Sequence, residues 1–487
     1  MAPSLPNEIY ILIAGFVQSP TDRLNLALCS KQLHQLLIPQ AYESILVRSS
    51  CIRALSRLAA TLYRNKRAAA AVRSLRFSNQ NCSHKQKLFI DRELMAEFTG
   101  KISSRVEEEE EEEEEDWTDT EEDDGESNME AQEEWKDAEL VNEWRDTLLG
   151  RRNEISGEQC DAWMAVLLTL MPKVEILHMS LDQSTKYRQQ ILQSPHLALG
   201  RLFTCLKEVT IPCSKTAVGV DVQEIMPFFK LPVMKKLVSC WVNDFGPPDD
   251  QKGRDSSIAD LRAQNCNSRT GCQRMILSCS ALETFVYEHA DGPGGTFMNT
   301  PAIYTPLKSH SDTLQKIEIY FTCFDDDLTP LVSSFFGSLV DFFNLRELRL
   351  SIMNILDWDL EEGTANNRFT DVLPVSLHSL TLDNFEACPD FPGVVDQLCD
   401  LWHHVDDLGE LNIRGSFTNG SCGCCPLHGV KFLESKYQAA AALIFAEYEC
   451  MGIGFSMWCE NLDDGDGDWL GEEFYEFHSV MRRRLYE

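Results

Sequence analysis

The densest group of potential metal ligands in the chain is Cys422, Cys424, Cys425 and His428. Zinc binds cysteine thiolates and histidine nitrogens, and a structural zinc site usually takes its four ligands as two spaced pairs. Here the four side chains are compressed into one short run with no second pair nearby. We therefore expect reduced loop thiols at this place, with no metal and no cofactor.

A second group, Asp464, Asp466 and Asp468, imitates the start of a calcium-binding loop. Such a loop needs a glycine at its sixth position and a bidentate glutamate at its twelfth. The corresponding residues here are Trp469 and Tyr475. We therefore expect a solvated acidic loop that binds no calcium.

Catalytic motifs are not found elsewhere in the sequence, which contains no HExxH, GxSxG or GxGxxG pattern and no phosphate-binding GxxxxGKS/T loop. His403 and His404 follow Trp402 in a stretch of helical periodicity, where a packing or surface role fits better than catalysis. No nucleophile is placed near a base in a recognisable pattern. The sequence therefore predicts a protein that is not an enzyme.

The elements that must position any functional residue come from a repeated motif, LxxLxL, in which L is usually an apolar residue. It begins eight times, at Val174, Leu206, Met234, Leu282, Leu314, Leu345, Leu377 and Leu408. Five of the seven intervals are 31 or 32 residues, which indicates a solenoid of repeated units. We interpret the one interval of 48 residues, which contains Gly246 to Gly271, as a polar insertion on a loop.

Each motif predicts a short strand whose fourth and sixth residues point inward, such as Leu348 and Leu350, and a helix that returns the chain. A strand and a helix at a fixed period predict an α/β solenoid, with parallel strands on one side and helices on the other. The outward strand positions would form a target-binding face, unless they are merely solvated. These positions are Arg76, His178, Thr210, Glu318, Tyr320, Arg349, Ser351, Thr381, Asp383, Asn412 and Arg414.

At the N-terminus, residues 5–46 are predicted to form three short helices. In the first, Ile9, Leu12, Ile13 and Phe16 recur on one apolar stripe. The second follows the turn at Pro20 and carries apolar residues on two nearly opposite faces, one with Leu26, Cys29, Leu33, Leu36 and Leu37, the other with Leu24, Ala27 and Leu28. A small core needs only one such face, so the other suggests a partner. The third helix is expected to begin after Pro39 and to include Ile45 and Leu46.

This stretch resembles the fungal form of the F-box. The matching residues are Leu5, Pro6, Glu8, Ile9, Ile13, Leu24, Leu28, Ser30, Leu33, Leu36, Pro39 and Tyr42, and the departures are Val17, Cys29 and Ala41. The repeats resemble the divergent leucine-rich repeats that follow F-boxes, although they lack the usual Asn or Cys ladder position.

The resemblance implies a substrate receptor of a Skp–cullin–F-box ubiquitin ligase. The F-box would bind the Skp-type adaptor and through it the cullin, and the repeats would hold an unknown target protein. The implied adaptor contacts are Leu5, Pro6, Ile9, Ile13, Leu24 and Leu28. The alternatives are an F-box scaffold that acts with the adaptor outside ubiquitination, and an enzyme that uses the Cys422 group.

The net charge of −33 argues against a nucleic-acid partner. Residues 107–134 contribute 19 acidic and no basic side chains, which predicts a disordered acidic tract. Trp117, Trp135 and Trp144 interleave with acidic residues in and beside this tract. We expect them to anchor the insert to its own domain, and docking on a partner is the alternative. A solvated spacer is the default role of the tract, and recruitment of a basic partner is the alternative.

The sequence thus divides into an F-box at 1–46, a linker helix and first repeat strand at 47–78, and an insert at 79–150. The repeat solenoid follows at 151–450, and a cap with an acidic tail at 451–487. No secretory signal or apolar membrane span is apparent, and the scattered cysteines favour a reducing compartment. We therefore expect a cytoplasmic or nuclear protein with no membrane partner.

Overall fold

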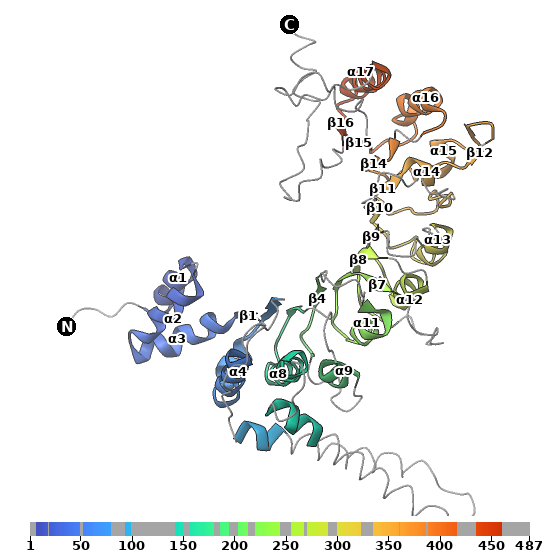
Figure 1. Cartoon of the computed structure of the whole chain (residues 1–487). Coiled ribbons are helices and arrows are strands. Elements are labelled where there is room, and N and C mark those ends of the chain that lie inside the picture. The colour runs from blue at the N-terminus through green and yellow to red at the C-terminus, as the bar shows by residue number, and fades with distance from the viewer. Residues whose placement is uncertain are drawn as a thin grey trace, which may run out of the picture. The chain divides into compact units, whose positions relative to one another are not determined.

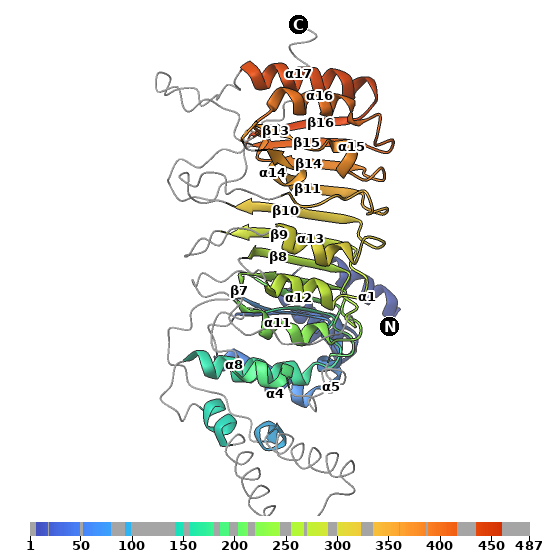
Figure 2. The same cartoon turned by 90° about the vertical axis from the view of Figure 1, so that its right-hand side faces the viewer.

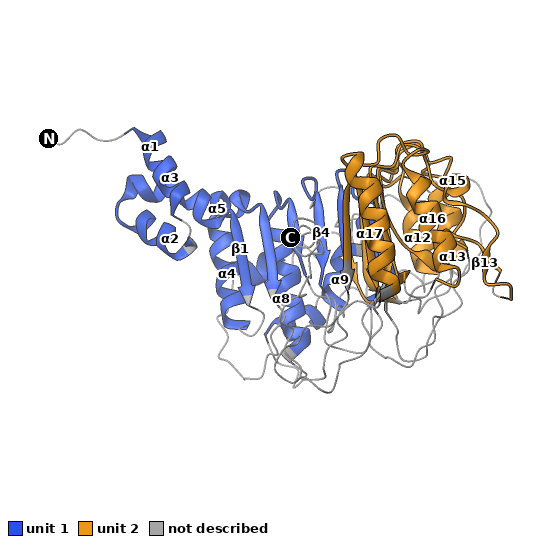
Figure 3. Cartoon of the chain, turned by 90° about the horizontal axis from the view of Figure 1, so that it is seen from above, with its two compact units in different colours: residues 1–238 blue, residues 239–487 orange. Residues whose placement is uncertain are grey.

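A computed structural model of the chain describes residues 6–17, 19–48, 52–78, 93–98, 142–149, 156–179, 186–193, 203–212, 220–243, 255–266, 270–290, 300–322, 335–359, 361–385, 388–415 and 435–459. The chain divides into two compact units, Met1–Val238 and Ser239–Glu487, which are coloured separately in Figure 3. Each unit is built from helices and from strands of a main sheet that pair in parallel, and the second unit also contains one short antiparallel strand pair.

The first unit opens with three short helices, α1 (Asn7–Phe16), α2 (Pro20–Leu28) and α3 (Lys31–Tyr42). Two serines set their boundaries. The Ser19 hydroxyl accepts a hydrogen bond from the Asp22 amide at 3.3 Å, and the Ser30 hydroxyl accepts one from the Leu33 amide at 3.1 Å. Each serine therefore caps the first turn of the helix that follows it.

The helix boundaries differ from the prediction in two places. The predicted second helix is divided at Ser30, because the serine cap starts a new helix there, and Pro39 lies inside α3. Ile45 and Leu46 belong to strand β1 (Ser44–Arg48) and not to a helix. Strand β1 therefore follows the third helix directly.

Strands and helices alternate through the rest of the first unit, and α4, α8, α9 and α11 lie on one side of its strands (Figure 1). The strands run in the order β1-β2-β3-β4-β6. The elements are α4 (Ile52–Arg64), α5 (Lys66–Ala71), β2 (Ser74–Ser78), α8 (Ser156–Leu170), β3 (Ile176–His178), α9 (Lys186–Gln193), β4 (Glu208–Ile211), β5 (Val220–Asp221), α11 (Val222–Phe229) and β6 (Lys236–Cys240). Strand β6 contains the sequence boundary between the units.

The segments 93–98 and 142–149, which flank the acidic tract, pack on this helical layer. The rings of Phe98 and Trp144 are 5.3 Å apart, and Trp144 meets the Tyr187 ring of α9 edge to face at 4.5 Å. Tyr63 of α4 donates a hydrogen bond to Glu97. Trp144 is buried, as expected of an anchor to its own domain. The tract at 107–134 and Trp135 lie outside the described residues.

In the second unit, the strand order is β8-β9-β10-β11-β14-β15-β16, and helices α12, α13, α16 and α17 lie on one face of these strands (Figure 2). Its elements are β7 (Val242–Asn243), β8 (Asp260–Cys266), α12 (Thr270–Ser278), β9 (Thr284–Ala290), α13 (Thr300–Lys308), β10 (Lys316–Thr322), β11 (Glu347–Ser351), α14 (Ile352–Ile355), β12 (Trp358–Asp359), β13 (Thr364–Ala365), α15 (Phe369–Val372), β14 (Ser379–Asp383), α16 (Phe391–Leu401), β15 (Glu410–Gly415), α17 (Ser435–Cys450) and β16 (Gly454–Cys459).

The predicted α/β solenoid is confirmed by the register of these strands. The fourth residue of each motif pairs with its counterpart in the next, so that Phe285, Ile317 and Leu348 stand in one row. The inward positions Leu348 and Leu350 are buried, as predicted. The fourth and sixth motif residues are buried in each of these repeats. The motif therefore determines which face of the sheet the helices cover.

The predicted loop insertion between the third and fourth motifs is wrong in part, because it contains strand β8. Ile258, Leu261 and Ala263 occupy the three apolar positions of the motif and are buried. The interval of 48 residues is therefore two repeats of 24 residues each. Alanine at the sixth position and the short spacing hid this repeat in the sequence.

Side chains connect neighbouring repeats where the usual ladder residue is lacking. Thr313 Oγ1 donates to the Leu282 carbonyl at 2.7 Å, and Asn344 Nδ2 donates to the Asp312 carbonyl at 2.6 Å. Ser376 Oγ donates to the Leu345 carbonyl at 2.9 Å. These bonds satisfy carbonyls in the turns before successive strands, which is where buried backbone groups need partners.

Among the described residues, no helix is both long and apolar enough to cross a membrane.

Candidate protein-binding surfaces

The three N-terminal helices leave several large apolar side chains exposed. Their fully buried core consists of Ala14, Ala27 and Leu37, against which the partly buried Leu26, Leu33 and Leu36 pack. Two of the three fully buried side chains are alanines, so the core is small. Phe16 is 79% exposed and Leu28 is 66% exposed. We call this surface the helical apolar face, and it comprises Ile9, Ile11, Leu12, Ile13, Phe16, Leu24 and Leu28.

Most of the predicted adaptor contacts lie on or beside this face. Ile9, Ile13, Leu24 and Leu28 are exposed large hydrophobic side chains, and Pro6 is exposed at the start of α1. Leu5 lies outside the described residues.

Sequence reasoning missed parts of this face. Ala27 was grouped with Leu24 and Leu28 but is fully buried. Phe16 was read only as part of an apolar stripe, whereas its side chain is exposed. The available signal was the small size of Ala14 and Ala27, which suits side chains buried in a small helical core.

The second candidate surface is the open face of the second unit, the sheet face opposite its helices. Alternation along the strands puts the third, fifth and seventh residues of each motif on this face. The register aligns Glu318, Arg349, Thr381 and Asn412 in one row across four neighbouring strands. The sequence therefore brought these predicted residues together correctly, as neighbours on parallel strands.

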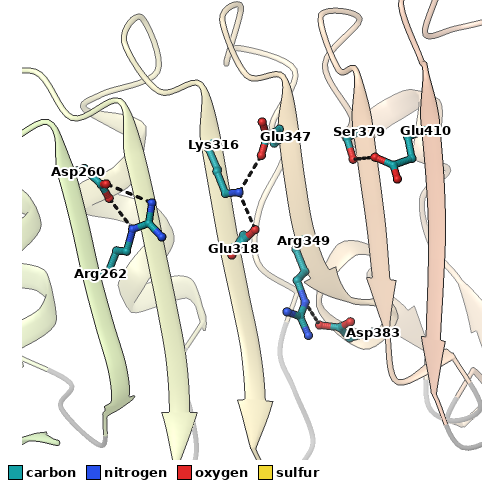
Figure 4. Close-up of polar contacts among 9 residues, drawn as sticks. All are labelled: Asp260, Arg262, Lys316, Glu318, Glu347, Arg349, Ser379, Asp383 and Glu410. Atoms are coloured by element: carbon teal, nitrogen blue, oxygen red, sulfur yellow. Dashed lines mark hydrogen bonds and ion pairs between the residues drawn. The ribbon is translucent and has the colours of Figure 1, made fainter. Parts of the chain in front are cut away.

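Charged pairs cover this face (Figure 4). Arg262 binds Asp260 through two hydrogen bonds, of 2.8 and 3.1 Å. Lys316 Nζ lies 2.8 Å from a Glu318 oxygen and 2.7 Å from a Glu347 oxygen. The third-position residues Asp260, Lys316 and Glu347 are not among the predicted site residues. Of the three, Lys316 contacts a predicted residue, Glu318.

Arg349 organises the centre of the face. Its Nε donates to Asp383 at 2.7 Å, and its guanidinium carbon lies 4.0 Å from the centre of the Tyr320 ring. Burial opposes the charge of Arg349, but the Asp383 carboxylate more than offsets this effect, so the pKa of Arg349 is raised. Burial, with the nearby charge of Glu288, raises the pKa of Tyr320 to about 12. Both side chains therefore keep their protons at neutral pH.

Two predicted residues are not accessible on this face. Ser351 is 1% exposed, and its hydroxyl accepts a hydrogen bond from the Met353 amide at the start of α14. Asp383 is 5% exposed beside Arg349. Their roles are to cap a helix and to hold the arginine. Arg414 and Thr381 are half-buried strand residues.

The remaining predicted residues form a short row in the first unit. Arg76, His178 and Thr210 are register partners on β2, β3 and β4. Burial and the charge of Arg76 lower the pKa of His178, while Glu208 opposes this shift. His178 is therefore neutral at physiological pH, and this row carries one positive charge.

The described residues contain no cluster of three or more His, Cys, Asp or Glu side chains suited to hold a metal. The Cys422 and Asp464 groups both lie outside them. Within them, the rings of His403 and Trp402 are tilted by 32° with their centres 3.4 Å apart. His403 is exposed and His404 is half-buried.

A comparison with family models matches residues 187–405 to the leucine-rich repeat domain. No curated protein matches the chain. The parallel sheet and the matched family model together show that this part of the chain is a leucine-rich repeat domain. Such domains stack repeats into an extended sheet face that binds other proteins.

Proposed function

We propose that the chain is a substrate receptor of a Skp–cullin–F-box ubiquitin ligase. The helical apolar face would dock on the Skp-type adaptor, and the leucine-rich repeats would bind a target protein. The chain itself would perform no chemistry. It would raise the effective concentration of a target lysine near the ubiquitin-conjugating enzyme.

The observation that carries this proposal is the exposure of the large apolar side chains on α1 and α2. Large apolar side chains exposed together on a soluble protein often mark a binding site. Phe16, Leu12 and Leu28 are 79%, 58% and 66% exposed. The F-box-like spacing of the same stretch supports an adaptor as the partner.

The first test is an adaptor-binding measurement with Leu28→Asp. Burying a leucine at an interface is worth roughly 1.5 to 3 kcal/mol, so affinity should fall at least about tenfold. Leu443→Asp, an equally apolar but unrelated exposed position on α17, is the matched control and should bind normally. Unchanged affinity of the Leu28 variant would refute the adaptor assignment.

The second test concerns the target. The double variant Tyr320→Ala with Arg349→Ala removes the centre of the open face, and we expect it to lose partners that co-purify with the unaltered chain. Retention of every partner would count against this face. A scaffold role outside ubiquitination predicts instead that the cullin does not co-purify and that partner lifetime is unchanged when residues 1–46 are deleted.

A further inference from the structure

An exposed apolar patch lies at the turns that lead into β11 and β14. Phe343 is 66% exposed and Val375 is 60% exposed. Val340, three residues before Phe343, is 44% exposed. Phe343 and Val375 stand at equivalent places, each two residues before the first apolar residue of its motif. The Ser376 hydroxyl donates to the Phe342 carbonyl at 3.4 Å and to the Leu345 carbonyl at 2.9 Å, which holds the two turns side by side.

Exposed carboxylates lie next to this patch on the open face of the second unit. Glu347 begins β11, and its side chain is 53% exposed. Glu410 begins β15 and is also exposed, and it accepts a hydrogen bond from Ser379 at 3.2 Å. Glu347 is the fourth residue after Phe343, which limits the distance between their Cα atoms to about 14 Å. A single extended segment of about five residues can reach both.

The charge balance of the open face favours a cationic ligand. Three of its four cations, Arg262, Lys316 and Arg349, each contact at least one carboxylate of the same face. The fourth is Arg414, the seventh residue of its motif, on β15. Glu410 accepts a hydrogen bond from a serine hydroxyl, and Glu347 shares its lysine with Glu318. Among the described strand positions of this face, carboxylates outnumber cations by six to four, so its net charge is negative. The carboxylates are Asp260, Glu288, Glu318, Glu347, Asp383 and Glu410.

We propose that this edge of the second unit binds a segment of a partner protein in which one large apolar side chain is flanked by lysine or arginine. The apolar side chain covers Phe343 and Val375, and the basic side chains pair with Glu347 and Glu410. This inference rests on the proposed target-binding role of the repeats and names the kind of segment that they recognise.

The test uses a fluorescein-labelled heptapeptide, Gly-Lys-Lys-Phe-Lys-Lys-Gly, and the full chain, with binding followed by fluorescence anisotropy. Two further peptides replace the phenylalanine by serine or all four lysines by glutamate. The acidic residues 107–134 also attract lysine, but they are present in every variant. Differences between variants therefore report the proposed site alone.

The variant Phe343→Ser with Val375→Ser should weaken binding roughly five- to thirtyfold, because exposed apolar area is lost from the contact. The variant Glu347→Gln with Glu410→Gln should weaken it roughly two- to tenfold at low salt. The matched controls are Leu277→Ser with Leu443→Ser, on two helices, and Glu361→Gln with Glu362→Gln, between β12 and β13. Both should bind as the unaltered chain does.

Equal affinity of the two site variants and their controls would overturn the inference, as would indifference to the phenylalanine or tighter binding of the glutamate peptide. The Leu28→Asp and the Tyr320/Arg349 experiments are independent of this outcome. If they succeed while the peptide binds without preference, the proposed function stands and only the assigned segment is wrong.

Discussion

Glu224 on α11 is a carboxyl group that the fold buries at a cost. Burial raises its pKa, the Gln189 side chain opposes the shift, and the negative charges of Asp221 and Asp161 add to it. Among the described residues, its Oε2 atom is buried without a hydrogen-bond partner. Because the pKa is higher in the folded than in the unfolded state, ionisation of Glu224 destabilises the fold, and this penalty is complete only above the folded-state pKa.

We therefore predict that Glu224→Gln stabilises the protein at pH 7.5 by roughly 0.5 to 1 kcal/mol, since the amide carries no charge to desolvate. The gain should shrink as the pH falls through the raised pKa and vanish below the ordinary value for glutamate, where both states are protonated. Urea unfolding of both proteins between pH 7.5 and 4.5 measures this difference. Glu283→Gln, at an exposed position, should give no gain, and a pH-independent gain for Glu224→Gln would contradict the explanation.

Ser376 shows what the side-chain ladder between repeats contributes. Its hydroxyl donates to a carbonyl of the preceding repeat, so alanine would leave that carbonyl without its donor. A hydrogen bond of this kind is worth roughly 0.5 to 1.5 kcal/mol. We expect Ser376→Ala to lower the free energy of unfolding by about 1 kcal/mol in urea titrations.

The control for Ser376 is Thr305→Ala. Thr305 Oγ1 also donates to a carbonyl, that of Pro301, but this bond stays within α13 and connects no repeats. Its loss should change stability by less than about 0.5 kcal/mol, as for most surface substitutions. Equal effects of the two alanine variants would show that the ladder has no special role.

Phe98 and Trp144, which flank residues 99–141 in the sequence, form an aromatic cluster with Tyr187 of α9. Phe98 contacts Trp144, which contacts Tyr187, and Lys186 forms an ion pair with Glu143. Removing a buried tryptophan side chain typically costs about 3 to 5 kcal/mol. We predict that Trp144→Ala increases amide hydrogen exchange in α9, measured by mass spectrometry, whereas Trp144→Phe preserves most protection. Unchanged exchange in α9 of the alanine variant would show that the aromatic cluster does not support that helix.

At the level of elements, the sequence predicted the strand positions that are buried periodically, once in each repeat. Leu348 and Leu350 were placed correctly because every repeat must bury the same two strand positions. Strand β8 was missed because Ala263 contributes little to the apolar pattern and because the spacing drops to 24 residues. The division at Ser30 was missed because a serine in an amphipathic run also fits a continuous helix, and only the bond to the Leu33 amide shows the cap.

The binding surfaces were predictable only in part, for a different physical reason. Alternation along a strand identifies which residues point outward, and it placed Glu318 and Arg349 side by side. Alternation does not show which side chains form ion pairs. The burial of Asp383 beside Arg349 could therefore not be predicted. The exposure of Phe16 likewise depends on which face of its helix meets the neighbouring helices, and the apolar pattern alone does not show that.

At the level of the whole molecule, the two candidate surfaces belong to different compact units and share no residue. The helical apolar face lies at the start of the first unit. Glu43, at the end of its helices, accepts hydrogen bonds through its carbonyl from the amides of Arg73 and Ser74, at 2.8 and 3.0 Å. The N-terminal helices are thus built directly onto the first pair of strands, while the open face is formed within the second unit.

We therefore predict that the two surfaces act independently. Leu28→Asp should weaken adaptor binding at least about tenfold and leave the affinity for the lysine–phenylalanine peptide unchanged. Phe343→Ser with Val375→Ser should weaken peptide binding and leave the affinity for the adaptor unchanged. In the combined variant, the change in binding free energy for each ligand should equal that of the corresponding single-surface variant within about 0.5 kcal/mol, as expected for sites that share no residues and no partners. Anisotropy titrations with the labelled peptide, in the presence and absence of the adaptor, measure the peptide affinity and its coupling to adaptor binding. The adaptor-binding measurement described above gives the other affinity. A coupling above that limit would mean that occupancy of one surface alters the other, which a solenoid of repeats that contact only their neighbours does not readily transmit.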